Sequence, residues 1–303
     1  MVERESRNGE REVRRVEARV IADGTGTGRG KSATALLLLL PGLALLTVVL
    51  AFPLASLVAG SFSGSAGPFT QYERIAGAPV YMLVLLRTVL ISAATALLCL
   101  ALGFPVAYRL TQASGLAKAA ILLCIFLSFW TNLLVRGFSW MVLLNPNGVI
   151  SHALEMLGIG FSVKLLYNTA GVLIGQTQIL LPYMILPIAA VMSRADRTHV
   201  RAARSLGASP IKAFFYVYIP SVKTGIQAGL VLVFTLSLGS FIVPALLGGP
   251  EDTFLAQLIE FSINSTLNLG FASALATLLL ATTLIIYWVA DRWFGLGQVW
   301  SAR

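Results

Sequence analysis

One apolar run of this chain, from Asn168 to Met192, reads NTAGVLIGQTQILLPYMILPIAAVM. It holds no Asp, Glu, Lys or Arg and exceeds the roughly 18 residues that mark a membrane-spanning helix. Five further runs have the same character, and they cover residues 33–59, 84–108, 119–143, 224–247 and 269–290. Arg87 and Arg136 are the charged residues within these runs. Because a charge at the centre of a membrane helix costs about 2.5–3.5 kcal/mol, the pattern predicts an all-α integral membrane protein with about six transmembrane helices.

The composition of the whole chain points the same way. The 303 residues are 57% hydrophobic and 12% charged, whereas a soluble domain carries about 25% charged residues. This balance excludes an ordinary cytosolic enzyme, a disordered chain and a secreted disulfide scaffold. Cys99 and Cys124 both lie in apolar runs, so each is expected to be a small buried hydrophobic side chain rather than half of a disulfide or a metal ligand.

The basic residues are distributed unevenly between the apolar runs. With the N-terminus in the cytoplasm, 18 Lys and Arg residues fall in the cytoplasmic segments 1–32, 109–118, 193–223 and 291–303. The opposite side holds three, which are Arg74, Arg87 and Lys164. Cytoplasmic segments of membrane proteins carry such an excess, so both termini are expected in the cytoplasm. The net charge of +9 therefore reflects orientation in the membrane and does not predict a nucleic-acid partner.

The first 32 residues form a polar segment with eight basic and six acidic residues. We expect a disordered, basic cytoplasmic tail here, followed by a transmembrane domain over residues 33–303. The stretch from Gly24 to Ser32 resembles a phosphate-binding loop, but Thr25 stands where that motif needs its first glycine. No ATP site is therefore expected on this chain.

Patterns typical of catalysis and metal binding are missing from the sequence. His152 and His199 have no second His or Cys at a ligand spacing. No combination of Ser, His and an acid resembles a nucleophilic triad. The sequence therefore predicts a protein that is not an enzyme, with no catalytic residue, no metal site and no cofactor bound by this chain.

The segment 193–223 is too polar to span a membrane, yet its pattern is regular. Four arginines recur at spacings of three and four, which predicts one basic face on a helix, and they are Arg194, Arg197, Arg201 and Arg204. Gly207 follows where a left-handed C-cap would end that helix. The segment is therefore expected to begin with a short basic helix and a glycine turn.

A second short helix is expected after the turn. Ser209 and Pro210 fit its N-cap and first position, aromatic residues follow, and the helix is expected to end near Pro220. The two helices could lie at the membrane surface with their arginines at lipid headgroups. Alternatively, they could dock a cytoplasmic partner and transmit its motion to the flanking spans.

Part of this segment, Arg201-Ala-Ala-Arg-Ser-Leu-Gly207 followed by Tyr218-Ile-Pro220, resembles the EAA loop of binding-protein-dependent ABC transporter permeases. The thirteen positions from Gly207 to Pro220 match the spacing of that loop. Further motifs resemble the first permease subunit of the spermidine/putrescine-type subfamily, and they are Phe129–Arg136 with Trp140, Leu165–Asn168, Leu181–Pro187 and Leu246–Gly249. The resemblance extends from about Ala33 to Ala290.

This resemblance implies a type I ABC importer permease in the bacterial inner membrane. Its implied partners are a second permease subunit, two ATPase subunits that bind ATP and Mg, a periplasmic solute-binding protein and membrane lipid. The residues implied in coupling to the ATPase are Arg201, Ala202, Ala203, Gly207, Ala208, Ser209, Phe214 and Pro220. Arg201 stands where the family has Glu, so any salt bridge of that Glu must be lost or rebuilt.

Polar side chains within membrane spans are costly and usually face a cavity. The candidates for a solute path are Trp130, Asn132, Arg136, Gln176, Gln178, Tyr183, Ser237 and Ser240. Gln176 and Gln178 point about 200° apart on a helix, so at most one of them is expected to face the path. Each candidate could instead make a helix–helix hydrogen bond.

The solute and one alternative function stay open at this point. A polyamine would favour carboxylates or aromatic faces, but the six runs contain no Asp or Glu, and an opine or an amino-acid-like solute fits about as well. A stand-alone secondary transporter is the alternative function, and it would need a coupling Asp, Glu or His in mid-membrane. The two halves of the sequence also show no matching pair of broken helices.

Overall fold

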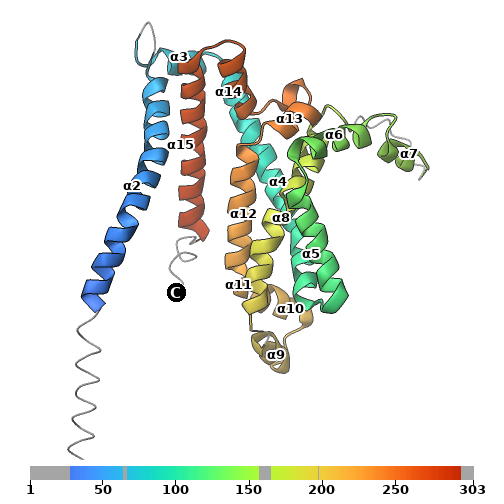
Figure 1. The fold of residues 1–303 in the computed structure, drawn as a ribbon. Coiled ribbons are helices and arrows are strands. Elements are labelled where there is room, and N and C mark those ends of the chain that lie inside the picture. Colours follow the sequence, from blue (N-terminus) through green and yellow to red (C-terminus); the bar gives the residue numbers. More distant parts are fainter. Residues whose placement is uncertain (1–27, 64–66, 157–164, 197, 295–303) are drawn as a thin grey trace, which may run out of the picture. The chain divides into compact units, whose positions relative to one another are not determined.

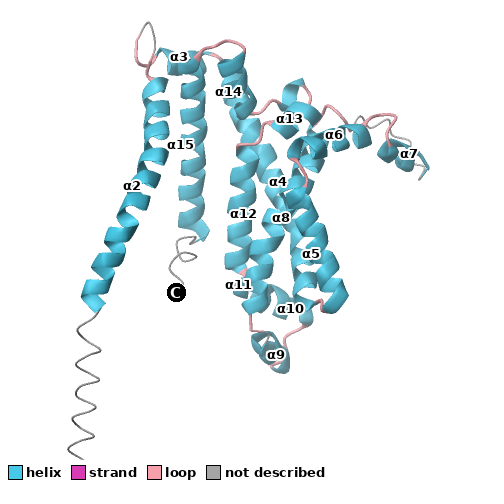
Figure 2. Ribbon diagram, in the orientation of Figure 1, coloured by secondary structure: helices cyan, strands magenta, loops and turns pink. Residues whose placement is uncertain are grey.

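The computed structural model describes residues 28–63, 67–156, 165–196 and 198–294 (Figure 1). All regular secondary structure within these ranges is helical (Figure 2). Helices are the expected outcome for such apolar runs, because a backbone segment in lipid must satisfy its own hydrogen bonds. The prediction of an all-α protein is confirmed.

The chain forms two compact units, residues 1–57 and 58–303, and helix α2 (Gly28–Ser61) crosses their boundary. α2 contains Pro41 and Pro53 and exposes apolar side chains such as Phe52, which is 72% exposed. It begins before Ala33, so residues 28–32 are helical although they were expected in the tail. The rest of that expected tail, residues 1–27, lies outside the described residues.

Four of the described helices are long and apolar enough to cross a membrane on their own. They are Leu39–Ser61 within α2, α4 (Pro79–Gln112), α8 (Thr169–Arg194) and Leu269–Arg292 within α15 (Leu269–Phe294). Two bent helix pairs raise the number to six if each pair counts as one span. The structure is therefore compatible with the six expected spans, two of them broken.

The expected span 119–143 contains a sharp break. α5 (Gly115–Trp130) ends there and α6 (Leu133–Leu144) begins, with an angle of 102° between the two helical segments. Side chains satisfy backbone groups at the break, because Asn132 Oδ1 accepts from the Leu134 N–H at 2.8 Å and Thr131 Oγ1 donates to the Leu127 carbonyl at 2.7 Å. Asn132 is thus a helix N-cap within a run that was expected to be one helix.

The expected span 224–247 is interrupted as well. α12 (Lys223–Leu238) ends before Gly239, and the short α13 (Ile242–Leu247) follows after Phe241. Neither this break nor the one before α6 falls at a proline, so the usual sequence signal for a kink was missing. These two breaks lie in different halves of the chain, and neither was expected from the sequence.

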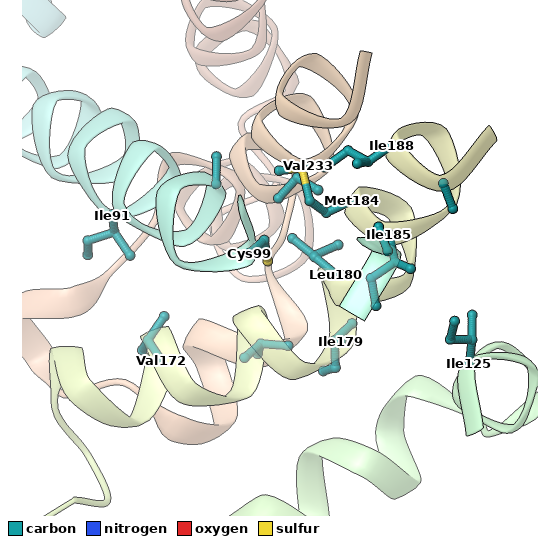
Figure 3. Close-up of a cluster of buried hydrophobic side chains, with 14 of the residues drawn as sticks. Ile91, Cys99, Ile125, Val172, Ile179, Leu180, Met184, Ile185, Ile188 and Val233 are labelled. Atoms are coloured by element: carbon teal, nitrogen blue, oxygen red, sulfur yellow. The ribbon is translucent and has the colours of Figure 1, made fainter. Parts of the chain in front are cut away.

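The larger unit has its core where α4, α8 and α12 pack together. Figure 3 shows buried side chains from these helices converging, among them Cys99, Met184 and Val233. Glycines allow the close approach of the helices, since a Cβ on Gly225 would lie 3.0 Å from the Pro187 carbonyl oxygen. Small residues at helix contacts are typical of membrane proteins, where packing rather than hydrophobicity drives association.

A second apolar cluster lies at one end of this unit. It joins α3 (Thr70–Gly77), the start of α4, α14 (Leu255–Asn264) and the start of α15. Tyr81 and Phe271 contact each other edge to face at 5.3 Å between ring centroids. The unit also contains two short elements, which are α7 (Val149–Met156) and the 3-10 turn η2 (Pro250–Asp252).

Candidate functional site

The polar segment between α8 and α12 begins with a break that the sequence did not indicate. α8 continues to Arg194, and α9 (Thr198–Ser205) starts after Asp196. The Asp196 carboxylate accepts from the Thr198 N–H at 2.8 Å. Hydrogen bonds from the Thr198 side chain and backbone lower the pKa of the Asp196 carboxyl below its usual value. This carboxylate therefore stays charged at neutral pH and starts α9.

The break changes the predicted arginine face. Arg194 belongs to α8, Arg197 lies outside the described residues, and Arg201 and Arg204 share α9. The expectation of four guanidinium groups on one helix was therefore wrong. Two exposed arginines remain together on α9, in a chain region where Asp196 is the nearest acid in sequence.

The turn after α9 has the geometry predicted for it. Gly207 adopts a φ of 91°, which side chains rarely allow. The Ala208 N–H donates to the Ala203 carbonyl and the Gly207 N–H to the Arg204 carbonyl, both at 3.0 Å, as in a Schellman motif. The predicted C-cap at Gly207 is confirmed.

The next helix also begins as predicted. Ser209 caps α10 (Pro210–Ala213), and its hydroxyl accepts from the Lys212 N–H at 3.3 Å. The helix continues through a π-helical turn η1 (Phe214–Tyr218) into α11 (Ile219–Ser221). The whole helical segment Pro210–Ser221 is bent by 65° from α12. We refer to residues 198–221, from α9 to α11, as the coupling segment.

Aromatic contacts fasten the coupling segment to α4. Phe214 meets Phe104 edge to face at 5.9 Å, and Tyr218 meets Tyr108 at 5.7 Å. Beside these rings lies a hollow of about 310 Å³ whose lining includes Arg201 and Arg204. Of the predicted coupling residues, those exposed on the segment are Arg201, Ala202, Gly207, Ser209 and Pro220, and those half-buried are Ala203, Ala208 and Phe214. The segment thus exposes arginine side chains and packs against α4 through aromatic side chains.

A larger cavity lies toward the opposite ends of the helices. Its volume is about 600 Å³, and both helix breaks form its walls, through Trp130–Leu133 and Gly239–Val243. Six of the eight path candidates line it, namely Trp130, Asn132, Arg136, Gln176, Tyr183 and Ser240. The aromatic residues Phe129 and Phe241 also line it, and the sequence analysis had not singled them out.

Gln176 is the most deeply buried polar residue of this lining, with 1% of its surface exposed. Its Oε1 accepts two hydrogen bonds, from Thr95 Oγ1 on α4 at 3.1 Å and from Ser237 Oγ on α12 at 3.2 Å. Its Nε2 is buried and has no hydrogen-bond partner among the described residues. The amide therefore links the three core helices through its oxygen and keeps its nitrogen available.

Two path candidates lie away from the cavity. Ser237 is fully buried and serves as a donor to Gln176. Gln178 accepts from Trp140 Nε1 at 3.2 Å, an interhelical hydrogen bond between α8 and α6. The prediction that at most one of Gln176 and Gln178 faces the cavity agrees with this geometry.

Arg136 is the charged residue of the cavity lining, and none of the lining residues is an acid. Its Nη1 donates to Ser128 Oγ at 2.9 Å, and its Nε is buried without a hydrogen-bond partner among the described residues. Two acids outside the cavity have local partners. Glu251 pairs with Arg87 at 3.2 Å, and Asp252 accepts from the Gly249 N–H at 3.0 Å.

The structure thus combines an apolar helical core, a capped helix pair between α8 and α12 and a polar cavity beside two helix breaks. Residues 99–293 match the family described as "Binding-protein-dependent transport system inner membrane component". This match covers more than half of the chain, and the chain belongs to that family.

Relatives narrow the family further. The spermidine/putrescine transport system permease protein PotB of Escherichia coli (strain K12) is 31% identical over 218 residues, which are 71% of this chain and 79% of PotB. The molybdenum transport system permease protein ModB of Mycobacterium bovis (strain ATCC BAA-935 / AF2122/97) is 30% identical over 163 residues, 54% of this chain and 60% of ModB. The chain is thus a permease of the spermidine/putrescine-type subfamily.

A solved structure supports the fold. A chain of the bacterial alginate ABC transporter in complex with an alginate pentasaccharide-bound periplasmic protein superposes with a TM-score of 0.68. It is 15% identical, and the match covers 87% of this chain and 94% of the transporter chain. The protein therefore has the type I ABC permease fold. The family match and the similarity to PotB make it a multi-pass inner-membrane permease subunit of an ABC importer.

Proposed function

We propose that this chain forms the membrane channel together with a second permease subunit and couples it to two ATPase subunits through the coupling segment. ATP and Mg bind to those subunits, and a periplasmic binding protein delivers a small polar solute. The observation that supports this proposal most directly is the Gly207 turn, where a left-handed C-cap joins two capped helices that project between α8 and α12.

The contacts of the coupling segment provide a route to the cavity. A movement of the segment acts on α4 through the Phe214–Phe104 and Tyr218–Tyr108 contacts. α4 carries Thr95, which is bonded to Gln176 in the cavity lining. Nucleotide binding can then shift the conformation of the cavity, provided that the ATPase binds the two permease conformations with different affinity.

The charge of Arg201 bears on the partner. In an EAA loop the position holds Glu, and here Arg201 and Arg204 present two guanidinium groups beside Phe214. We propose that the matching ATPase offers a carboxylate to these arginines, because arginine pairs well with a carboxylate in two parallel hydrogen bonds.

The test is Gly207→Asp in the chain expressed with its own partner subunits. At a φ of 91° a side chain strains the backbone by about 1–2 kcal/mol, and the turn opens. We expect the variant to stay in the membrane but to lose at least tenfold of the co-purifying ATPase. The measurement is the ratio of ATPase to permease after mild solubilisation and affinity purification.

The matched control is Gly115→Asp. Gly115 also has a positive φ, of 55°, and a Cβ at either glycine would meet no atom within 4 Å. Gly115 lies at the start of α5, outside the coupling segment, so the control is expected to retain the ATPase. Equal ATPase recovery from both variants, or a wild-type chain that purifies without an ATPase or second permease, would contradict the proposed function.

A further inference from the structure

The residues that line the cavity differ widely in exposure. Trp130 at its rim is 86% exposed, whereas Gln176 is 1% exposed and lies deepest among the polar lining residues. Gln176 Oε1 is already occupied by the hydroxyl groups of Thr95 and Ser237. In this orientation of the amide both hydroxyl groups donate to the oxygen, and Nε2 is left as a hydrogen-bond donor.

A buried amide nitrogen without a partner carries a free-energy cost of about 1–3 kcal/mol. Gln176 Nε2 has no partner among the residues that the structure describes, and the same holds for Arg136 Nε in the same cavity lining. Two unpartnered donors around one cavity indicate that the missing acceptor comes from a molecule that enters it. The acceptor of a third polar residue is taken, since Asn132 Oδ1 binds the Leu134 N–H.

The charge of the lining favours the same kind of ligand as these donors do. Arg136 carries a positive charge, and the described residues that line the cavity include no Asp or Glu. An ammonium group entering the cavity would bring further donors to Gln176 and would be repelled by the guanidinium group, in surroundings where charges interact more strongly than in water. A carboxylate or a phosphate-like oxyanion would satisfy both donors and the charge.

We propose that the cavity binds the anionic group of the transported solute, with Gln176 Nε2 and the Arg136 guanidinium group as its donors. This inference rests on the proposed function, because it takes the cavity to be part of the solute path. Both nitrogens are closed to solvent in this conformation, so the anion reaches them when the walls move. The helix breaks at Asn132 and Gly239 lie in those walls and allow α6 and α13 to move apart from α5 and α12.

The test uses the assembled importer, purified with its partner subunits in lipid nanodiscs. Sodium glutamate probes a carboxylate, sodium phosphate probes an oxyanion, and putrescine dihydrochloride probes a cation, each against sodium chloride at equal ionic strength. The readout is the probe concentration that gives a half-maximal rise in the thermal unfolding temperature, since a ligand that binds the native state stabilises it.

Two substitutions isolate the donor of Gln176. Gln176→Glu keeps an oxygen for the Thr95 and Ser237 hydroxyls and replaces the nitrogen by a second oxygen, while Gln176→Met removes both polar atoms at similar size. The matched control is Thr177→Val, because Thr177 is also buried, also has an unpartnered side-chain oxygen, and does not line the cavity.

We expect glutamate or phosphate to stabilise the wild type and the Thr177→Val variant alike, and to need at least tenfold higher concentration with either Gln176 variant. The probe that stabilises the importer at the lower concentration tells whether the bound group is a carboxylate or a phosphate-like oxyanion. The inference is overturned if neither anion distinguishes the wild type from Gln176→Glu, or if putrescine stabilises the wild type and does so more strongly after Gln176→Glu. An importer that does not assemble would instead contradict the proposed function.

Discussion

Gln176 and Gln178 show how far helix geometry alone predicts the direction of a side chain. Gln176 and Gln178 are two positions apart on α8, so their side chains diverge by about 200°. Gln176 lines the cavity, and Gln178 accepts from Trp140 Nε1. The divergence was predictable from the sequence. Which of the two faces the cavity was not, because that depends on where α6 and α12 lie.

Caps were the residues that the sequence predicted best. Gly207 and Ser209 have the cap geometry expected of them, since a left-handed turn and an N-cap need particular residue types. Asn132 and Asp196 are local signals of the same kind, but each lies within or beside a longer pattern that favoured a continuous helix. The regular arginine spacing around Asp196 favoured one continuous helix, so the break after α8 was not predicted.

Asp252 offers a test of a buried carboxylate outside the cavity. It is 6% exposed, accepts from the Gly249 N–H at 3.0 Å and from Thr169 Oγ1, and so ties η2 to the start of α8. Replacing it by Ala leaves both donors without an acceptor, and we expect a loss of about 1–3 kcal/mol of stability. The measurement is thermal unfolding of the purified importer.

The neighbouring Glu251 is the control for this prediction. Its side chain is 84% exposed and pairs with Arg87, so Glu251→Ala should change the stability by about 0–1 kcal/mol. Arg87 also donates to the Glu251 backbone carbonyl, and that hydrogen bond survives the substitution. If Glu251→Ala destabilises the importer as much as Asp252→Ala, the assignment of the carboxylate cap is wrong.

At the level of helices, hydropathy located the spans but not their interruptions. Runs of apolar residues predict where a chain crosses the membrane, because each run has to bury its backbone in lipid. A break is tolerated where the free backbone groups find side-chain partners or face a cavity. Thr131 and Asn132 provide such partners and the cavity lies beside both breaks, which is tertiary information that no single run contains.

The close contact between α8 and α12 depends on Gly225 of α12, which has no side chain to separate the two helices. A Cβ on Gly225 would lie 3.0 Å from the Pro187 carbonyl oxygen and 3.1 Å from the Ile188 Cα, and backbone atoms cannot move aside. We expect Gly225→Ala to push the helices apart and to destabilise the importer by about 1–3 kcal/mol. Thermal unfolding of the purified importer measures this effect.

Gly103 on α4 provides the comparison. Its Cβ would lie 3.1 Å from Met184 Cγ, an atom of a flexible side chain that can change its rotamer. Gly103→Ala should therefore cost less than Gly225→Ala. The opposite order would mean that α4, rather than α12, makes the tighter contact with α8.

At the level of the larger unit, the coupling segment and the cavity lie at opposite ends of the same helices. The coupling segment connects α8 to α12 at one end, and both helices reach the cavity lining with Gln176 and Gly239 near the other end (Figure 1). Thr95 on α4 and Ser237 on α12 both bond to Gln176. The three core helices thus share one polar contact beside the cavity, and ring contacts at Phe104 and Tyr108 join α4 to the coupling segment.

This arrangement makes a prediction about the two sides of the membrane. The excess of basic residues predicts that the coupling segment and the α4–α5 turn lie in the cytoplasm, and the cavity end is then expected to face the periplasm. In a chain with Cys99→Ala and Cys124→Ala, single cysteines at Ser114 and Ser205 should react with an impermeant maleimide only after the inner membrane is opened. Cysteines at Ser63, Asn147 and Asn264 should react in intact spheroplasts.

Asn147 is the informative position among these five, because it lies just after α6, in the second segment of the bent pair. If that pair crosses the membrane once despite its 102° bend, Asn147 lies on the same side as Ser63 and Asn264. A re-entrant pair would return the chain to the side of Ser114 and would leave α8 to start in the cytoplasm, with the coupling segment outside. Labelling of the Asn147 cysteine only in opened membranes would therefore contradict both the six-span topology and the placement of the coupling segment beside an ATPase.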